Sequence, residues 1–99
     1  MPLELFVSRR AAREVERIVH WWAVNRPAVP GAVRQDLQAA LNLLLVQPDI
    51  GARVSEASSP DVRRVHLDRI RYWVYYRVQR NRLEVLSLWH SSRGSDPSV

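Results

Sequence analysis

The fold is decided by residues 62–94, whose sequence is VRRVHLDRIRYWVYYRVQRNRLEVLSLWHSSRG. Three short runs rich in Val, Leu, Tyr and Trp follow one another here, interrupted only at residues 67–70 and 79–82. Runs of this composition separated by short polar breaks are typical of antiparallel β-strands joined by tight turns. The stretch therefore predicts a three-stranded antiparallel meander.

The part of the chain before the meander is predicted to contain one strand and two helices. Residues 3–7 are rich in β-formers, and Ser8 follows them as a candidate N-cap, because its hydroxyl can accept from a free backbone N–H. Apolar residues then recur at helical spacing on both sides of a short connection at 25–30, which predicts an antiparallel helix hairpin. The two apolar stripes are Ala11, Val15, Ile18 and Trp22, and Val33, Leu37, Leu41 and Leu44.

Together these elements predict a single α+β domain at residues 1–94. It consists of an N-terminal strand, the helix hairpin and the meander, which packs one face on the helices. A chain of 99 residues supports one thin core and no second domain. Residues 47–61, which contain two Pro and three Ser, are expected to form a loop into the meander, and residues 95–99 a mobile tail.

The charge and the cysteine content narrow the classes of partner and site. All fifteen basic residues are Arg, and the net charge of +5 favours a polyanionic partner or an acidic protein segment. The absence of Cys excludes disulfides and thiolate metal sites, and the three His are too scattered for a local metal motif. We therefore expect no metal and no cofactor. We also expect a cytoplasmic protein without a membrane partner, because no secretory signal or long apolar run is present.

Two tight turns in the meander would fix which side chains share a face. With residues 80 and 81 at the tip of the second hairpin, Arg77 lies opposite Glu84 and Arg71 opposite His90; the first pair joins opposite charges. The same register sets Tyr75 opposite Leu86 and Trp73 opposite Leu88. With residues 68 and 69 at the tip of the first hairpin, His66 lies opposite Arg71, and Arg64 opposite Trp73.

This register would gather four basic side chains on the open face of the sheet. Arg64, His66, Arg71 and His90 would lie beside Trp73, Tyr75, Leu86 and Leu88. Such a cluster suits a phosphate-bearing or carboxylate-bearing ligand, and the two His could act as general acid or base. The alternative is a solvated Arg face with locally satisfied His. The face expected to pack on the helices carries Tyr72, Val74, Tyr76, Val78, Leu83, Val85 and Trp89.

The adjacent Trp21 and Trp22 cannot point the same way, because they are about 100° apart around a helix. Trp22 belongs to the apolar stripe and is predicted to be buried. Trp21 lies at its margin, where both core packing and contact with a partner remain open.

The order of VRRVHL, RYWVYYRV, LEVLSLWH and SSRG, preceded by a strand and a helix hairpin, resembles the ParE/RelE superfamily of type II toxin–antitoxin toxins. The resemblance covers residues 2–94 and implies an α+β toxin that a small antitoxin wraps and neutralises. The antitoxin would carry an acidic C-terminal segment, for which Trp21, Trp73 and Tyr75 are the candidate contacts.

The resemblance implies two alternative activities. RelE-like members are metal-independent endoribonucleases that cleave mRNA on the ribosome, and ParE-like members poison DNA gyrase. Carried over by position, Arg64, His66, Arg71 and His90 would be catalytic only in the nuclease, and Arg93 would contact the target or a phosphate. A third hypothesis is a non-toxic basic RNA-binding module.

The departures from the RelE pattern favour the ParE-like alternative. The chain contains no Lys, and no Tyr follows Gly94; both are groups that RelE-like nucleases use near the reacting phosphate. Glu56 could replace a glutamate base only if its loop folded back toward Arg71. The ending W-H-x-x-R, by contrast, resembles ParE. Whether the protein is an enzyme is left open by the sequence.

Overall fold

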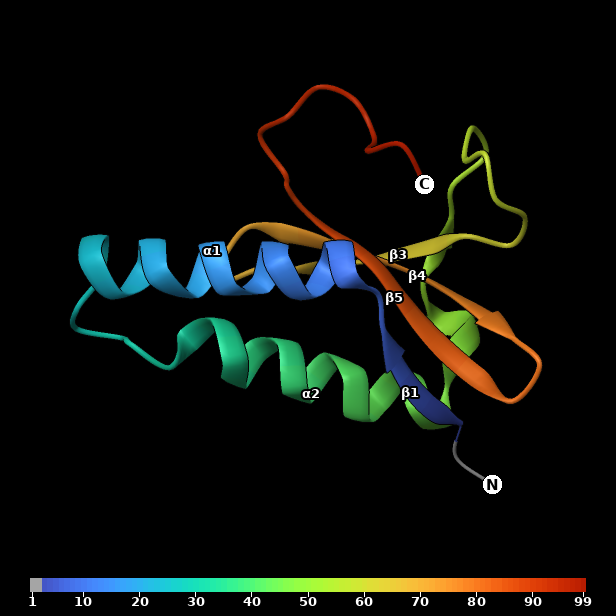
Figure 1. Cartoon of the computed structure of the whole chain (residues 1–99), viewed down its shortest axis with the longest axis horizontal. Coiled ribbons are helices and arrows are strands. Elements are labelled where there is room, and N and C mark those ends of the chain that lie inside the picture. Colours follow the sequence, from blue (N-terminus) through green and yellow to red (C-terminus); the bar gives the residue numbers. More distant parts are fainter. Residues whose placement is uncertain (1–2) are drawn as a thin grey trace.

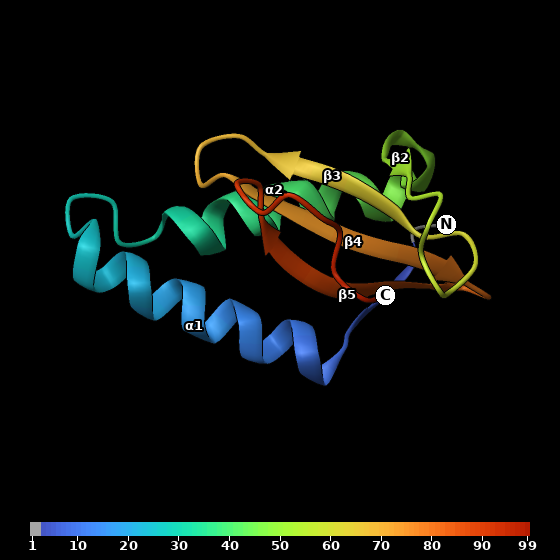
Figure 2. The ribbon, with the colours of Figure 1, turned by 90° about the horizontal axis from the view of Figure 1, so that it is seen from above.

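The computed structural model describes residues 3–99 as a five-stranded sheet with two helices packed on one face (Figures 1 and 2). The sheet order is β1-β5-β4-β3-β2, in which β1 pairs with β5 in parallel and the other neighbours are antiparallel. The predicted strand, helix hairpin and meander are confirmed, and β2 is a short edge strand inside the predicted loop. The elements are β1 Glu4–Val7, α1 Arg9–Asn25, α2 Ala32–Val46, η1 Pro48–Ile50, β2 Ala52–Arg53, β3 Arg63–Leu67, β4 Tyr72–Gln79 and β5 Arg82–His90.

Both helices form where the sequence pattern places them. Ser8 caps α1, because its Oγ accepts a hydrogen bond from Ala11 N at 3.0 Å. The whole predicted stripe of α1 is buried, and so is that of α2 apart from the partly buried Leu37. Trp22 is buried and Trp21 is 48% exposed, as their positions on the helix predict. Neither helix is both long and apolar enough to cross a bilayer.

The register between β4 and β5 begins as predicted and then changes at a β-bulge. Gln79 pairs with Arg82, and Arg77 with Glu84. Between Tyr76, which pairs with Val85, and Tyr75, which pairs with Ser87, one extra residue is inserted in β5. That residue is Leu86.

The bulge makes three predicted pairings wrong. Tyr75 does not face Leu86, Trp73 faces Trp89 instead of Leu88, and His90 faces Tyr72 instead of Arg71. Because side chains alternate along a strand, one inserted residue exchanges the two faces of β5 beyond it. Trp89 therefore lies beside Trp73 on the open face, while Leu88 joins the core and His90 turns toward the helices with Tyr72.

The register between β3 and β4 differs from the prediction by two residues. Leu67 pairs with Tyr72 instead of Ile70, because residues 68–71 form a wider turn in which Arg71 N donates to Leu67 O at 2.8 Å. Arg71 has a φ of 65°, a conformation that its sequence does not signal. An even shift leaves the faces unchanged. The predicted pairs His66–Arg71 and Arg64–Trp73 are wrong; the observed pairs are His66–Trp73 and Arg64–Tyr75.

The core lies between the helices and the covered face of the sheet. Of the face predicted to pack on the helices, Val78 is exposed at the end of β4 and Trp89 has moved to the other face. The remaining members are buried or packed against the core: Tyr72, Val74, Tyr76, Leu83 and Val85.

Candidate functional site

The four basic side chains predicted to form one cluster are divided between two surfaces. Arg64 lies in a groove on the open face of the sheet, and His66 packs beside it on Trp73. Arg71 and His90 line a cavity on the helix side. The division follows from the bulge, which turns His90 away from β3, and from the wide turn, which removes Arg71 from the strand.

The helix-side surface contains a cavity of about 480 Å³ between the end of α1, the β3–β4 turn and the end of β5. We call it the helix-side cavity. None of its described lining residues is acidic, and Arg69, one of its three Arg, is paired with Asp36 at 2.6 Å. Arg26 and Arg71 are thus left to meet an anionic ligand. Its lining residues are Trp21, Trp22, Arg26, Arg69, Ile70, Arg71, Tyr72 and His90.

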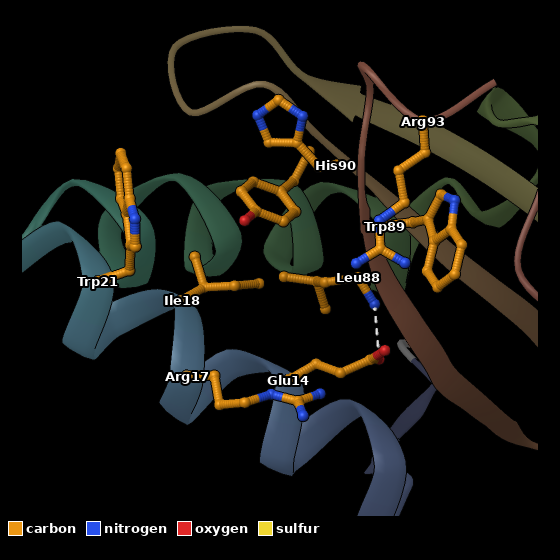
Figure 3. A pocket seen from close by; sticks show the side chains of 9 residues that line it. Glu14, Arg17, Ile18, Trp21, Leu88, Trp89, His90 and Arg93 are labelled. Carbon is orange, nitrogen blue, oxygen red and sulfur yellow. Dashed lines mark hydrogen bonds between the residues drawn. The ribbon is translucent and has the colours of Figure 1, made fainter.

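A second cavity of about 380 Å³, which we call the α1–β5 cleft, is seen from close by in Figure 3. The two share Trp21, Tyr72 and His90, so they form one continuous depression. Arg17 and Arg93 approach the cleft from α1 and from the segment after β5 (Figure 3). The cleft is lined by Glu14, Arg17, Ile18, Trp21, Tyr72, Leu88, Trp89, His90 and Arg93.

Glu14 forms one wall of this cleft and holds α1 to the sheet. Beyond Val85 the outer edge of β5 has no strand partner, because β1 ends at Val7. Glu14 Oε1 instead accepts hydrogen bonds from Leu88 N at 3.1 Å and Ser87 Oγ at 2.9 Å, and its residue is only 8% exposed (Figure 3). This role of Glu14 was not predicted from the sequence. The available signal was a carboxylate set within the apolar stripe of α1.

His90 is oriented by the turn that follows it. Its Nδ1 accepts a hydrogen bond from Ser92 N at 3.1 Å and lies 2.6 Å from Ser92 Oγ. A ring nitrogen that accepts from a backbone N–H carries no proton, so we infer that the neutral ring is protonated at Nε2. His90 also packs edge-on against Tyr72, with 4.9 Å between ring centroids. In this tautomer Nε2 is the hydrogen-bond donor of the ring.

Tyr72 keeps its phenol neutral in the same depression. Burial raises the pKa of Tyr72 above its usual value, and the positive charge of Arg93 lowers it in part. The hydroxyl therefore remains a hydrogen-bond donor well above neutral pH.

The groove on the open face, which we call the sheet-face groove, is built around Arg64. The Arg64 guanidinium lies 3.9 Å from the Trp73 ring centroid, and its Nη1 donates to Tyr75 Oη at 3.3 Å and to Asp96 Oδ1 at 3.1 Å. Arg93 stacks on Trp89 at 3.9 Å and borders both this groove and the α1–β5 cleft. The groove is lined by Arg64, Trp73, Tyr75, Trp89, Ser91, Arg93, Gly94, Ser95 and Asp96.

His66 is engaged locally on this face. Its Nδ1 lies 2.6 Å from Asp68 Oδ1, and its ring packs on Trp73 with 4.7 Å between centroids. The other ring nitrogen, Nε2, is buried without a hydrogen-bond partner among residues 3–99. His66 lines neither of the cavities that His90 lines.

The comparison with protein families decides the identity of the fold. Residues 5–94 match the family model described as the ParE toxin of the type II toxin–antitoxin system parDE. The chain belongs to this ParE toxin family. It is thus a ParE-like toxin of a type II toxin–antitoxin system, and a cognate antitoxin is its partner.

A solved structure has the same ParE fold. The structure described as the chromosomal ParDE TA system from P. aeruginosa superimposes with a TM-score of 0.73 at 24% sequence identity. The match covers 89% of this chain and 95% of that one. No curated protein matches the chain at a significant level of sequence similarity.

The candidate antitoxin contacts of this ParE toxin occupy different environments. Trp21 is exposed beside Arg26 and lines both the helix-side cavity and the α1–β5 cleft. Trp73 is partly buried beneath Arg64, and Tyr75 is fully buried beneath the C-terminal segment. Their roles, and those of the basic residues, stay predictions. Glu56 lies exposed in the loop between β2 and β3 and lines neither surface.

Proposed function

We propose that this ParE toxin inhibits DNA gyrase in the cytoplasm, and that it contacts the enzyme through the helix-side cavity and the α1–β5 cleft. The proposal includes Arg71 and Arg93 as contacts to acidic or phosphate groups of the gyrase complex. A cognate antitoxin with an acidic C-terminal segment neutralises the toxin, with Trp21, Trp73 and Tyr75 as its contacts. The observation that carries the choice of target is the separation of the two His.

A ribonuclease of the RelE type needs a base for the ribose 2′-hydroxyl, an acid for the leaving oxygen and a cation for the phosphate, all around one position. Here His66 is paired with Asp68 on one face, and His90 lies on the other. His90 accepts at Nδ1 from the backbone of Ser92 and so presents a donor. This arrangement supports binding over phosphodiester cleavage.

The helix-side depression is suited to an anionic macromolecular surface. Arg17, Arg26, Arg71 and Arg93 surround Trp21 and Tyr72, and Glu14 is the one described acid among the lining residues. Arg side chains around exposed aromatic rings are common at the energetic centres of protein interfaces. A net charge of +5 also accelerates association with acidic surfaces.

The test is inhibition of purified gyrase. The toxin should block supercoiling of relaxed plasmid, and the double variant Arg71→Ala, His90→Gln should lose this inhibition. Arg53→Ala is the matched control, because Arg53 is exposed on the edge strand β2 and lines neither the helix-side cavity nor the α1–β5 cleft. Undisturbed supercoiling at saturating toxin would contradict the proposed target.

One observation favours the RelE-like nuclease as a second candidate: Arg71 and His90 share a cavity with the phenol of Tyr72. A translating lysate separates the two functions. Cleaved transcripts that disappear with the same double variant would assign the nuclease, and cleavage retained by the variant would rule out this site. Induced expression should arrest growth, and co-expression of the adjacent small open reading frame should relieve the arrest. Unimpaired growth at confirmed expression would favour the non-toxic RNA-binding module.

A further inference from the structure

The C-terminal segment lies on the open face of the sheet and makes three different kinds of contact there. Trp89 Nε1 donates to the carbonyl oxygen of Ser95 at 2.8 Å. The Asp96 carboxylate accepts from both Arg64 and Tyr75, at 3.1 and 2.5 Å. Pro97, the next residue, is buried. In Figure 2 the segment runs back over the strands from the end of β5.

These contacts recognise a peptide and not a charge alone. An indole N–H binds a main-chain carbonyl, a guanidinium and a phenol bind the following carboxylate, and the residue after it is enclosed. A phosphate could replace the carboxylate, but in a peptide the main-chain carbonyl and the carboxylate stand on adjacent residues, which is the spacing that Trp89 and Arg64 contact here. The chemistry of the groove therefore favours an extended protein segment with an acidic side chain.

The groove is also preorganised for this ligand. Trp73 supports the Arg64 guanidinium from below at 3.9 Å, and Tyr75 is fully buried, with its hydroxyl at the groove. Donors held in place before binding lose little conformational freedom when a ligand arrives. The groups that bind Asp96 belong to the strands β3 and β4, not to the tail.

We propose that the sheet-face groove is a binding site for an acidic extended segment of a partner protein, and that Ser95–Asp96–Pro97 occupies it in cis until that segment displaces it. The inference rests on the proposed function only in naming the antitoxin as this partner. Binding of the partner then requires release of the tail. The contacts of Asp96 therefore lower the apparent affinity of the groove for the partner.

The size of this reduction in affinity depends on the covalent connection between the tail and the rest of the chain. A short tether holds its ligand at an effective concentration of roughly millimolar, so even a weak contact is well populated. The tail reduces the apparent affinity of any competitor in proportion to its own occupancy of the groove. Removing the Asp96 charge should therefore strengthen binding of an acidic peptide about tenfold, since it removes the charge-assisted hydrogen bonds that hold the tail in the groove.

The experiment titrates the full-length chain with the capped peptide Gly-Ser-Asp-Pro-Ser-Val and follows calorimetry and the fluorescence of the groove tryptophans. Asp96→Asn should bind the peptide about tenfold more tightly than the parent. The peptide with Asn in place of Asp should bind Asp96→Asn about tenfold more weakly than the Asp peptide. Combining Asp96→Asn with Arg64→Ala should abolish binding. Asp61→Asn, the same change in an exposed Asp that pairs with Arg53, should match the parent.

Three results would each overturn the proposal. These are equal peptide affinity for the parent and Asp96→Asn, equal affinity of the Asp and Asn peptides, and tighter binding of a short single-stranded RNA than of the peptide to Asp96→Asn. If Arg64→Ala unfolds, Arg64→Lys keeps the charge without the planar fork and should weaken the peptide at least severalfold.

The peptide assay contains neither gyrase nor antitoxin, so its failure leaves the proposed target untouched. Failure of gyrase inhibition would likewise leave the groove intact. The antitoxin arm joins the two: Asp96→Asn should bind the antitoxin more tightly than the parent does, and Arg64→Ala more weakly. If both changes leave the affinity for the antitoxin unaltered, the antitoxin is not the partner that binds the groove.

Discussion

The helix-side cavity and the sheet-face groove contain the same three kinds of side chain, but only one of them supplies its own anion. Arg71, Trp21 and Tyr72 line the cavity, whereas Arg64, Trp73 and Tyr75 line the groove. In the groove the Asp96 carboxylate accepts from the guanidinium and the phenol. No acidic residue of the described chain lines the cavity. A basic surface is therefore available to an external anion only where the chain's own carboxylates leave Arg side chains unpaired. Its composition alone does not decide this.

The largest expected effect is a difference between the two surfaces in their contribution to gyrase inhibition. Arg26→Ala combined with Arg71→Ala should weaken gyrase inhibition at least about 100-fold, because two charge-assisted contacts of about 1.5–3 kcal/mol each are lost. Arg64→Ala should change inhibition less than about threefold, because Arg64 is already paired with Asp96. The measurement is the inhibitory concentration in a supercoiling assay. A loss with Arg64→Ala as large as that of the double variant would place the target contact in the groove.

A second effect concerns Glu14, which forms one wall of the α1–β5 cleft. Glu14→Ala should lower the free energy of unfolding by about 2–3 kcal/mol, because Leu88 N–H and the Ser87 hydroxyl lose their acceptor in a buried position. Glu14→Gln retains an amide oxygen and should cost less than half as much. Glu16→Ala, at an exposed position on the same helix, should stay within about 0.5 kcal/mol. Urea denaturation measures all three, and equal costs at the two Ala positions would refute the role of Glu14.

A smaller effect compares the two phenols. Tyr75→Phe removes the hydroxyl that donates to Asp96 and accepts from Arg64, and should destabilise the chain by about 1 kcal/mol. Tyr72→Phe should be close to neutral, because the Tyr72 hydroxyl makes no hydrogen bond to any residue from 3 to 99. Thermal unfolding measures the difference. A costlier Tyr72→Phe would mean that the cavity also holds an internal partner.

The smallest effect is a pair of opposite pKa changes. Burial and the hydrogen bond to Asp96 raise the pKa of Tyr75, whereas Arg93 lowers the pKa of Tyr72, which burial raises. In absorbance titrations of tyrosinate, Asp96→Asn should lower the Tyr75 pKa, and Arg93→Ala should raise that of Tyr72. Shifts of the same sign would contradict the assigned neighbours.

The raised Tyr pKa values also fix a direction for stability. A phenol whose folded pKa exceeds its unfolded value of about 10 contributes its full stabilisation below that pH. The contribution falls as the pH rises through the folded pKa. Denaturation curves should therefore show stability declining from about pH 10 upward, and less steeply in Tyr75→Phe than in the parent.

The sequence predicts the elements well because their signals are local. The Ser8 cap, the α1 stripe and the Gln79–Arg82 turn each depend on neighbours within a few residues, and all three are confirmed. Family membership follows from the order of such elements, so the sequence alone indicates it.

The candidate site could not be predicted in the same way, because it depends on where two strands lose their regular register. Leu86, the inserted residue, is flanked by Val85 and Ser87 and carries no Gly or Pro to indicate a bulge. Arg71 adopts a positive φ that Gly or Asn would have signalled. The bulge at Leu86 and the positive φ of Arg71 therefore place His90 and Arg71 away from Arg64, and neither residue type signals this. The place of Asp96 depends on a contact 32 residues away in the chain.

The parallel pairing of β1 with β5 bears on how the toxin is made. Glu4–Val7 finds its partner only in Arg82–Val85, near the opposite end of the chain. Contacts this distant in sequence form late, because the intervening chain must first be synthesised and its ends brought together. During translation Glu4–Val7 is therefore made early and stays without a strand partner until Arg82–Val85 has been synthesised. A chain that ends before Arg82 has no partner for β1 and does not complete the sheet.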